Sequence, residues 1–353
     1  MRIMANVLVV GAGPTGLTAA LELARLGLSV QIVERRAAPS PLSRAVGLQK
    51  RSIDILKPTG VADTILSEAI IFDAVAIHRS TRLVGRLPLN FDDRSRIWGL
   101  PQDRTEHHMI DGLTRAGISV RFGEAVAALR QDADGVIVTL PSGEERFDYV
   151  IGADGVHSTV RGAIGLPFDG YDLPDLWSIA DVIAPDWQHP ATFQGYFLPE
   201  GQVCVVVPLQ THRFRIIASK PDALAALPVP MDVTEVRRSG SFTIPVRHVP
   251  RFTVGRVFLA GDAAHCHSPV GGRGMNLGIA DAADLASRIA GNRTDDYSAA
   301  RLIESRQVIR RTETVRRMLQ GPAWRRNIGF GAIRLAKSVP PLARVMMRSF
   351  VSG

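Results

Sequence analysis

The sequence predicts an α/β fold made of two intertwined domains and a helical C-terminal segment. A glycine-rich turn stands near the N-terminus, between an apolar strand-like run and a helix-like stretch. Similar strand–turn patterns return at residues 149–155 and 257–262, and strand-rich segments with alternating apolar residues lie between them. These observations predict a discontinuous, Rossmann-like α/β domain interrupted by a mostly antiparallel β-sheet domain.

The composition is that of an ordinary globular protein with a substantial core. The chain has 353 residues, of which 46% are hydrophobic and 22% charged, which excludes disordered and fibrous classes. Cys204 and Cys266 lie far apart, so we expect no disulfide framework and a reducing, cytoplasmic location. Because no stretch reaches about 18 apolar residues and no signal peptide is visible, we expect no transmembrane helix.

The first domain begins with a βαβ pattern. Residues 6–10 are typical of a buried parallel strand, residues 17–28 favour a helix, and residues 29–33 favour a second strand. Later elements are expected as helices at 51–56, 104–115 and 274–290, and as strands at 149–151 and 257–260. We expect the discontinuous domain to comprise residues 1–70, 100–170 and 255–300.

Two other regions complete the predicted organisation. Residues 71–99 and 171–254 are rich in alternating apolar residues and are expected to form the inserted β domain. Residues 301–353 favour helices, interrupted at Pro340 and Pro341, and carry 12 Lys/Arg against 2 Asp/Glu. The tail therefore has a net charge of 12 − 2 = +10, and the preceding residues carry 8 − 10 = −2.

The first chemical motif is the run Gly11-Ala12-Gly13-Pro14-Thr15-Gly16, between the first strand and the first helix. Gly11 permits a tight turn, Gly13 lets a pyrophosphate approach the backbone, and Gly16 permits close helix–strand packing. The helix N-terminus offers unpaired N–H groups and a partial positive charge. The run predicts a dinucleotide site that also includes Pro14 and Thr15; the alternative is a chance glycine turn.

An acidic residue supports the dinucleotide interpretation. Glu34 ends the second strand, 18 residues after Gly16. A carboxylate at this place accepts hydrogen bonds from an adenosine ribose and repels a 2′-phosphate. We expect the neighbouring Arg35 to contribute to the same site. This first motif does not by itself separate FAD from NAD.

Two further motifs follow in the chain. Residues 148–161 have the sequence DYVIGADGVHSTVR, and residues 255–276 have the sequence GRVFLAGDAAHCHSPVGGRGMN. In the latter, Asp262 ends a buried strand and is placed to accept hydrogen bonds from a polyol. Gly272 and Gly274 let the backbone pass close to a flat ring. The helix that begins near Met275 would direct its N-terminal N–H groups toward that ring. The alternative is a strand–turn–helix unit with a capping aspartate.

The three motifs GxGxxG, GADGxxSxVR and GDAAHxxxPxxGxGxN, in this order and spacing, resemble those of the flavoprotein aromatic-ring hydroxylases. These are class A flavoprotein monooxygenases with the para-hydroxybenzoate hydroxylase-like fold. The resemblance extends from Val7 to at least Leu285. It implies FAD as cofactor and NAD(P)H as a transient reductant. It also implies hydroxylation of an aromatic or quinone-like small molecule by O₂ through a flavin C4a-hydroperoxide.

The resemblance also implies roles for individual residues. Gln102 would bond the ribityl chain; the alternative is a local role at the start of a helix. Arg44 would reach the cofactor phosphates; the alternative is a solvated arginine on the surface. Asp154 would either contact the cofactor or hold its own turn. Pro269 would form a wall of the substrate pocket. Val126 and Asn276 complete the expected cofactor contacts.

The substrate is expected between the flavin and the inserted sheet. Phe193, Tyr196, Phe197 and Phe242 are candidates for its pocket, but alternation alone does not say which of them point inward. Because a second GxGxxG is missing, NAD(P)H would dock without a Rossmann domain of its own. A same-fold FAD oxidoreductase without oxygen insertion and a non-catalytic flavin- or ligand-binding protein remain alternatives.

The basic tail leaves two interpretations open. Apolar residues recur at helical spacing among its arginines, which is typical of a helix on the inner, anionic face of a membrane. The alternative is that these helices pack on the body of the protein. Recognition motifs for nucleic acid and metal-ligand spacings are absent from the sequence, so neither partner is expected. The oligomeric state is left open.

Overall fold

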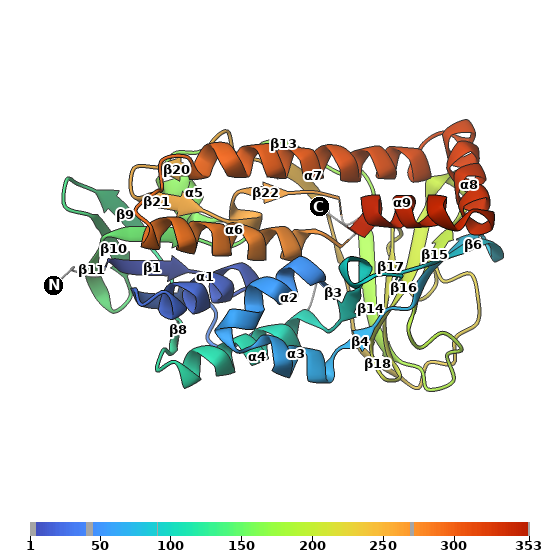
Figure 1. Ribbon diagram of the computed structural model, residues 1–353, viewed down its shortest axis with the longest axis horizontal. Helices are drawn as coiled ribbons and strands as arrows, with labels where there is room; N and C mark the ends of the chain where they lie inside the picture. The colour runs from blue at the N-terminus through green and yellow to red at the C-terminus, as the bar shows by residue number, and fades with distance from the viewer. Residues whose placement is uncertain (1–4, 40–44, 90, 269–271, 352–353) are drawn as a thin grey trace.

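The computed structural model describes residues 5–39, 45–89, 91–268 and 272–351 and confirms the predicted α/β fold class (Figure 1). A six-stranded sheet occupies one half of the molecule and a seven-stranded sheet the other, and helices lie along both. Arg44 and Pro269, two of the predicted site residues, lie outside the described residues.

The six-stranded sheet has the order β20-β21-β12-β1-β2-β8. Five strands are parallel, and β20 pairs antiparallel at the edge. Buried valines, leucines and isoleucines fill these strands, as is usual where helices and loops cover both faces. The strands are β1 (Asn6–Val10), β2 (Ser29–Glu34), β8 (Val120–Phe122), β12 (Tyr149–Gly152), β20 (Thr253–Val254) and β21 (Val257–Leu259).

Three helices, α1 (Pro14–Arg25), α4 (Gln102–Arg115) and α6 (Gly274–Ala290), share one apolar core with this sheet. Helix α1 begins at Pro14, three residues before the predicted start, because proline is well suited to the first turn of a helix. A Cβ at Gly16 would lie 1.9 Å from the carbonyl oxygen of Gly11. Glycine is therefore required for the close approach of α1 to the turn before it.

The seven-stranded sheet has the order β18-β14-β17-β16-β15-β5-β6. Its pairs are antiparallel except for β5 with β15. Segments far apart in the sequence thus meet in one sheet, as the interrupted pattern predicts. The strands are β5 (Ala74–Arg79), β6 (Arg82–Pro88), β14 (Trp177–Ile183), β15 (Thr192–Phe197), β16 (Val203–Gln210), β17 (Arg213–Ala218) and β18 (Glu235–Phe242).

Three smaller sheets complete the β structure. The first, β3 (Gly47–Gln49), β7 (Ile97–Gly99) and β4 (Ile70–Ile71), lies beside strand β16 of the large sheet. The second is the meander β9 (Ala128–Gln131), β10 (Val136–Leu140) and β11 (Gly143–Phe147). The third is β13 (Asp169–Asp172), β19 (Pro245–His248) and β22 (His265–Cys266).

Between the two large sheets, an ionic cluster joins α3 (Ala62–Glu68), α4 and β16. Glu68 accepts hydrogen bonds from Arg104 at 2.8 and 2.9 Å and from Gln210 at 2.8 Å, and it lies 2.8 Å from His108 Nε2. Because these residues come from both halves of the molecule, Glu68 fixes one half against the other. The remaining helices before the tail are α2 (Lys50–Leu56) and α5 (Thr159–Ala163).

The C-terminal segment forms three helices, α7 (Tyr297–Gln320), α8 (Ala323–Ser338) and α9 (Pro340–Val351). Helix α7 runs along the molecule from one large sheet to the other, and α8 turns sharply from its end (Figure 1). Ile333 of α8 packs against Gly85 of β6, and Arg348 of α9 forms a 2.6 Å ion pair with Asp92. The tail therefore packs on the body. Among the described helices, none is long and apolar enough to cross a bilayer.

Candidate active site

The glycine-rich motifs meet at one edge of the six-stranded sheet. Strands β1, β2, β12 and β21 are parallel, so their carboxyl ends lie together. The GxGxxG run follows β1, the GADG run follows β12 and the Gly261–Asp262 turn follows β21. Ligands of open α/β sheets bind outside the carboxyl ends of such strands.

Gly11 joins two of the motifs. Its φ of +105° is favoured only for glycine, and a Cβ there would lie 2.5 Å from the carbonyl oxygen of Ala153. The Gly11 amide donates to the carbonyl of Val33 at 2.8 Å. The turn is therefore held between the ends of β2 and β12.

Four other described glycines of the three motifs face open space. A Cβ at Gly13, Gly155, Gly272 or Gly274 would meet no described atom within 4 Å. Gly13 is the N-cap of α1, and no side chain of the described structure caps that helix or α6. Both helices thus present N–H groups and partial positive charge without a protein partner from a cap. We call the open region beside these four glycines and the two helix N-termini the cradle. Its partial positive charge and open backbone suit an anionic, flat ligand.

Glu34 is buried and already engaged by the protein. Its carboxylate accepts from the Ala12 amide at 2.8 Å and from the Arg36 amide at 3.0 Å. Burial alone would raise the pKa of Glu34, but the hydrogen bonds from Arg36 and Ala12 lower it below the ordinary value. The carboxylate is therefore charged at neutral pH and fixes the glycine turn; its bond to a ribose stays a prediction. Arg36 forms an ion pair with this carboxylate, whereas Arg35 is exposed and its expected cofactor contact stays a prediction.

Asp154 holds the second motif together. Its carboxylate accepts from the hydroxyl of Ser158 and, at 3.1 Å, from the amide of Val160. Burial raises the pKa of Asp154. Arg161 donates to the carbonyl of Ala263 at 3.0 Å and so ties this motif to the third one. Asp154 thus holds its own turn through these hydrogen bonds, while its direct contact with the cofactor stays a prediction.

Gln102 begins α4, where the sequence motif places it. Its side-chain oxygen accepts from the Ala45 amide at 3.1 Å, and its nitrogen donates to Glu106 at 2.7 Å. Glu106 is 2% exposed, and burial raises its pKa to about 7. Gln102 therefore links α4 to the segment just after Arg44, and its predicted bond to the ribityl chain remains untested.

The Gly261–Asp262 turn rests on a buried ionic network that the sequence motifs do not reveal. The carboxylate of Asp281 in α6 accepts from the Gly261 amide at 2.9 Å and from Arg301 at 2.7 Å, and it lies 2.6 Å from His265 Nε2. Asp281 is 0% exposed. Burial would raise the pKa of Asp281, but His265 and Arg301 lower it. An acidic residue on the otherwise apolar face of a predicted helix is the sequence pattern that could have identified it.

Asp262 itself is exposed at this turn, whereas the neighbouring Gly261 and Ala263 are buried. Its carboxylate thus has access to a ligand, as the sequence predicts for the ribityl chain. Thr15 lies under the same turn, since a Cβ on Gly261 or Gly278 would come within 2.5 or 2.2 Å of its hydroxyl. Thr15 therefore occupies the space that these two glycines leave between α1 and α6.

Asn276 braces the start of α6. Its oxygen accepts from the Gln49 amide at 2.8 Å and the Ser52 hydroxyl at 2.7 Å, and its nitrogen donates to the carbonyls of Gly47 and Gly272 at 2.9 Å. Met275 and Val126 are buried in the apolar core. For these three residues the structure shows packing roles, and cofactor contact stays a prediction.

Comparison with known proteins agrees with this geometry. A family model described as "FAD binding domain" matches residues 4–223 and 222–312. Rifampicin monooxygenase of Streptomyces venezuelae is 35% identical over 311 residues, which are 81% of this chain and 64% of that protein. The chain belongs to the family of FAD-dependent aromatic monooxygenases.

Two solved structures extend the likeness. The p-nitrophenol 4-monooxygenase PnpA of Pseudomonas putida DLL-E4 superposes with a TM-score of 0.88 at 26% identity, covering 99% of this chain and 98% of that one. Aklavinone-11 hydroxylase, in a ternary complex with FAD and aklavinone, gives a TM-score of 0.77 at 27% identity, with 92% and 71% coverage. The present chain thus spans nearly all of PnpA, but less than two thirds of rifampicin monooxygenase.

FAD is the cofactor of this family, and the described residues fit it. The open glycines and the two uncapped helix N-termini suit a pyrophosphate and a flat ring with an anionic edge. The exposed Asp262 suits a polyol chain. A buried site already filled by side chains would not have fitted this group.

The structure also sorts the aromatic candidates of the inserted sheet. Phe193 packs beside Val46 and Ile97, on the face directed toward the FAD-binding half. Tyr196 belongs to a separate core on the opposite face. Phe197 packs against Phe330 of α8 with ring centroids 5.7 Å apart, and Phe242 packs beside Trp177. Phe193 is therefore the only one of the four in the cluster shared with the FAD-binding half.

Gly13→Val tests the cradle without disturbing the protein core. Because a Cβ at Gly13 meets no described atom and its φ is −81°, the apoprotein should fold, with an N-cap cost of about 1 kcal/mol. The valine side chain should nevertheless block the pyrophosphate, and the purified variant should contain no FAD. Flavin absorbance and circular dichroism measure the two effects. Gly240→Val, at an equally open glycine in β18, is the control and should retain FAD; retention of FAD by both variants would contradict the assignment.

Proposed function

We propose that this protein is an NAD(P)H-dependent monooxygenase that uses FAD to insert one atom of O₂ into an aromatic or quinone-like small molecule. The observation that carries the proposal is the convergence of three motifs on one open, uncapped cradle beside the inserted sheet. Its relatives support it, since rifampicin monooxygenase and p-nitrophenol 4-monooxygenase are named for oxygen insertion.

Bound FAD supplies the redox chemistry, accepting a hydride from NAD(P)H and activating O₂ at its C4a position. The protein holds and orients this group. Gly13 and the N-terminus of α1 would bind the pyrophosphate, Glu34 a ribose, and Asp262 the ribityl chain. The N-terminus of α6 would stabilise negative charge on the reduced ring through its N–H groups.

The protein also shapes the place of reaction. The face of the seven-stranded sheet that carries Phe193, Val75 and Val207 is apolar and packs toward the FAD-binding half. Such a surface excludes water and orients a flat substrate against the flavin. NAD(P)H would bind transiently, because the sequence holds no second GxGxxG run.

Labelled oxygen tests the reaction directly. The holoenzyme, supplied with NADPH or NADH and ¹⁸O₂, should oxidise the nicotinamide faster when a substrate is present, and one ¹⁸O atom should appear in the product by mass spectrometry. A panel of phenols, quinones and heteroaromatics provides the candidates. Formation of hydrogen peroxide alone across that panel would contradict oxygen insertion and favour the alternative of an FAD oxidoreductase without it.

We further propose that the outer side of α8 contacts an anionic bilayer. Trp324, Ile328 and Leu335 are 60%, 60% and 57% exposed and lie on one side of the helix. Phe330 and Ile333 are buried on the opposite side. Arginines flank the exposed stripe, and the tail from residue 301 has a net charge of +10 (12 Lys/Arg, 2 Asp/Glu). Each such charge near an anionic surface contributes about 1 kcal/mol.

Vesicle flotation tests this contact. The full chain should float with phosphatidylserine-containing vesicles at low salt and less at physiological salt, because ions screen the attraction. Trp324→Ser with Ile328→Ser should abolish flotation. Leu83→Ser with Val236→Ser, which removes two exposed apolar residues elsewhere, should leave it unchanged. Absence of the wild-type chain from the floated fraction at low salt would refute the proposal.

A further inference from the structure

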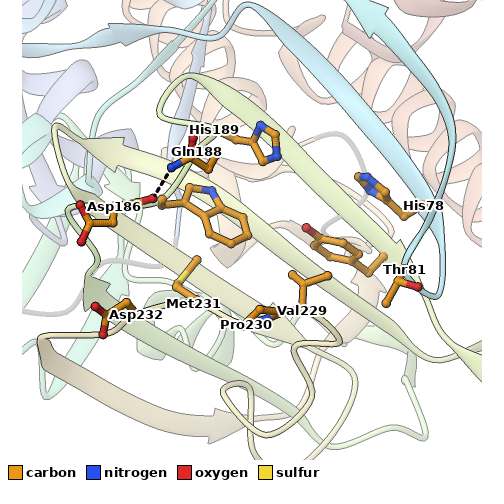
Figure 2. Close-up of a pocket in the computed structure, with 11 residues that line it drawn as sticks. His78, Thr81, Asp186, Gln188, His189, Val229, Pro230, Met231 and Asp232 are labelled. Carbon is orange, nitrogen blue, oxygen red and sulfur yellow. Dashed lines mark hydrogen bonds between the residues drawn. The ribbon is translucent and has the colours of Figure 1, made fainter.

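A cavity of about 340 Å³ lies on the seven-stranded sheet, apart from the cofactor cradle (Figure 2). Its walls come from strands β5 and β15, from the loop after β14 and from the segment before β18. The lining residues are His78, Thr81, Asp186, Trp187, Gln188, His189, Tyr196, Val229, Pro230, Met231 and Asp232. None of them belongs to the motifs that form the FAD site.

The cavity and the proposed substrate surface lie on opposite faces of the sheet. Successive residues of a strand point to opposite faces, so Tyr196 and Phe193, three residues apart in β15, diverge. Phe193 packs with the FAD-binding half, whereas Tyr196 packs with Ala180 and Phe214 in a separate core. A molecule bound beside Tyr196 would therefore be separated from the flavin by the thickness of the sheet.

Four of the lining residues carry aromatic rings. The His78 and Tyr196 rings stack with centroids 4.7 Å apart and an interplanar angle of 20°. The Trp187 ring lies at 84° to that of His189, with a centroid distance of 5.6 Å. Val229, Pro230 and Met231 lie along one side of the cavity and His78 along the other (Figure 2). Such walls suit a flat, apolar ring system.

Two nitrogen atoms in this lining are buried without a partner among the described residues, Nδ1 of His78 and Nε1 of Trp187. Buried polar groups are usually hydrogen-bonded, so unpaired ones in a cavity wall indicate a place for a ligand or for water. Burial, the largest effect, lowers the pKa of His78, as does the nearby His189, so His78 is neutral at pH 7. It therefore adds no positive charge to the cavity.

The charged residues of the lining are all acidic. Asp186 and Asp232 are exposed at the cavity, and neither lysine nor arginine is among its described lining residues. Carboxylates repel an anion, and aromatic faces attract a cation through their quadrupoles. The charge pattern thus favours a positively charged aromatic ligand over a carboxylate or phenolate of similar size.

We propose that this cavity is a second ligand site, for an aromatic molecule that carries a protonated amine. The ring would lie between Trp187 and Tyr196, and the ammonium group would face Asp186 and Asp232. The site does not depend on the proposed oxygenation, because the sheet separates it from the flavin.

Calorimetric titration of the FAD-loaded protein with 1-naphthylmethylammonium and, as its anionic match, 1-naphthoate tests the proposal. The ammonium probe should bind about tenfold more tightly than the carboxylate probe, because Asp186 and Asp232 attract the first and repel the second. The flavin absorbance spectrum should not change on binding. Equal affinities, no saturable binding of the ammonium probe, or a flavin spectral shift on binding would overturn the proposal.

Matched charge variants locate the site. Asp186→Asn with Asp232→Asn should remove most of the preference for the ammonium probe. Asp175→Asn with Asp295→Asn, which neutralises two exposed aspartates outside the lining, should preserve it. Since all four side chains are exposed, the variants should fold as the wild type does. Equal loss of preference in both pairs would show a diffuse effect of net charge and would overturn the assigned site.

Discussion

The buried carboxylate of Asp281 is the constraint on which the cofactor side of this protein depends. It contacts the Gly261 amide in the turn after β21 and Arg301 in the next helix, and it lies beside His265. A buried charge without these partners would be strongly unfavourable. Because every partner comes from a different segment, α6, α7 and the Gly261–Asp262 turn are fixed relative to one another. Arg301 extends the network to Glu304, which pairs with Arg51 of α2.

This constraint explains what holds the shape of so open a cradle. The glycines that face the open space contribute no side-chain contacts, so the surrounding geometry has to be held from behind. Thr15 fills the gap between α1 and α6, Asn276 braces the start of α6, and Glu34 bonds the amide of Ala12. The uncapped N-termini of α1 and α6 are thereby directed to one region, where their partial charges act together.

The sequence predicted the elements that repeat a local pattern and missed contacts between distant ones. The first glycine motif predicted the βαβ unit, because its turn demands glycine at particular positions. FAD was implied by the resemblance of the three motifs to those of the flavoprotein hydroxylases. The pairing of Asp281 with Arg301 joins two helices whose relative placement no local pattern specifies. Likewise, alternation along β15 did not say which of its aromatic residues points toward the FAD-binding half. The sequence also did not reveal that Arg36 pairs with Glu34, and the expected contribution of Arg35 to the cofactor site stays a prediction.

A comparison of FAD affinity and stability in Asp281→Asn and Asp284→Asn measures how far the cofactor side depends on the Asp281 carboxylate. Asparagine keeps the shape of residue 281 but removes the buried charge that pairs with Arg301 and His265, and Arg301 then retains only its ion pair with the partly exposed Glu304 among the described residues. This loss should cost about 3–5 kcal/mol in the free energy of unfolding. The loosened Gly261–Asp262 turn should also weaken FAD binding by about tenfold or more, a loss of at least 1.4 kcal/mol. Asp284 forms a 2.9 Å ion pair with the partly exposed Arg288, and its replacement by asparagine should cost about 1 kcal/mol or less. Equal FAD dissociation constants and equal unfolding free energies for the two variants would show that the Asp281 carboxylate does not hold the cofactor side together.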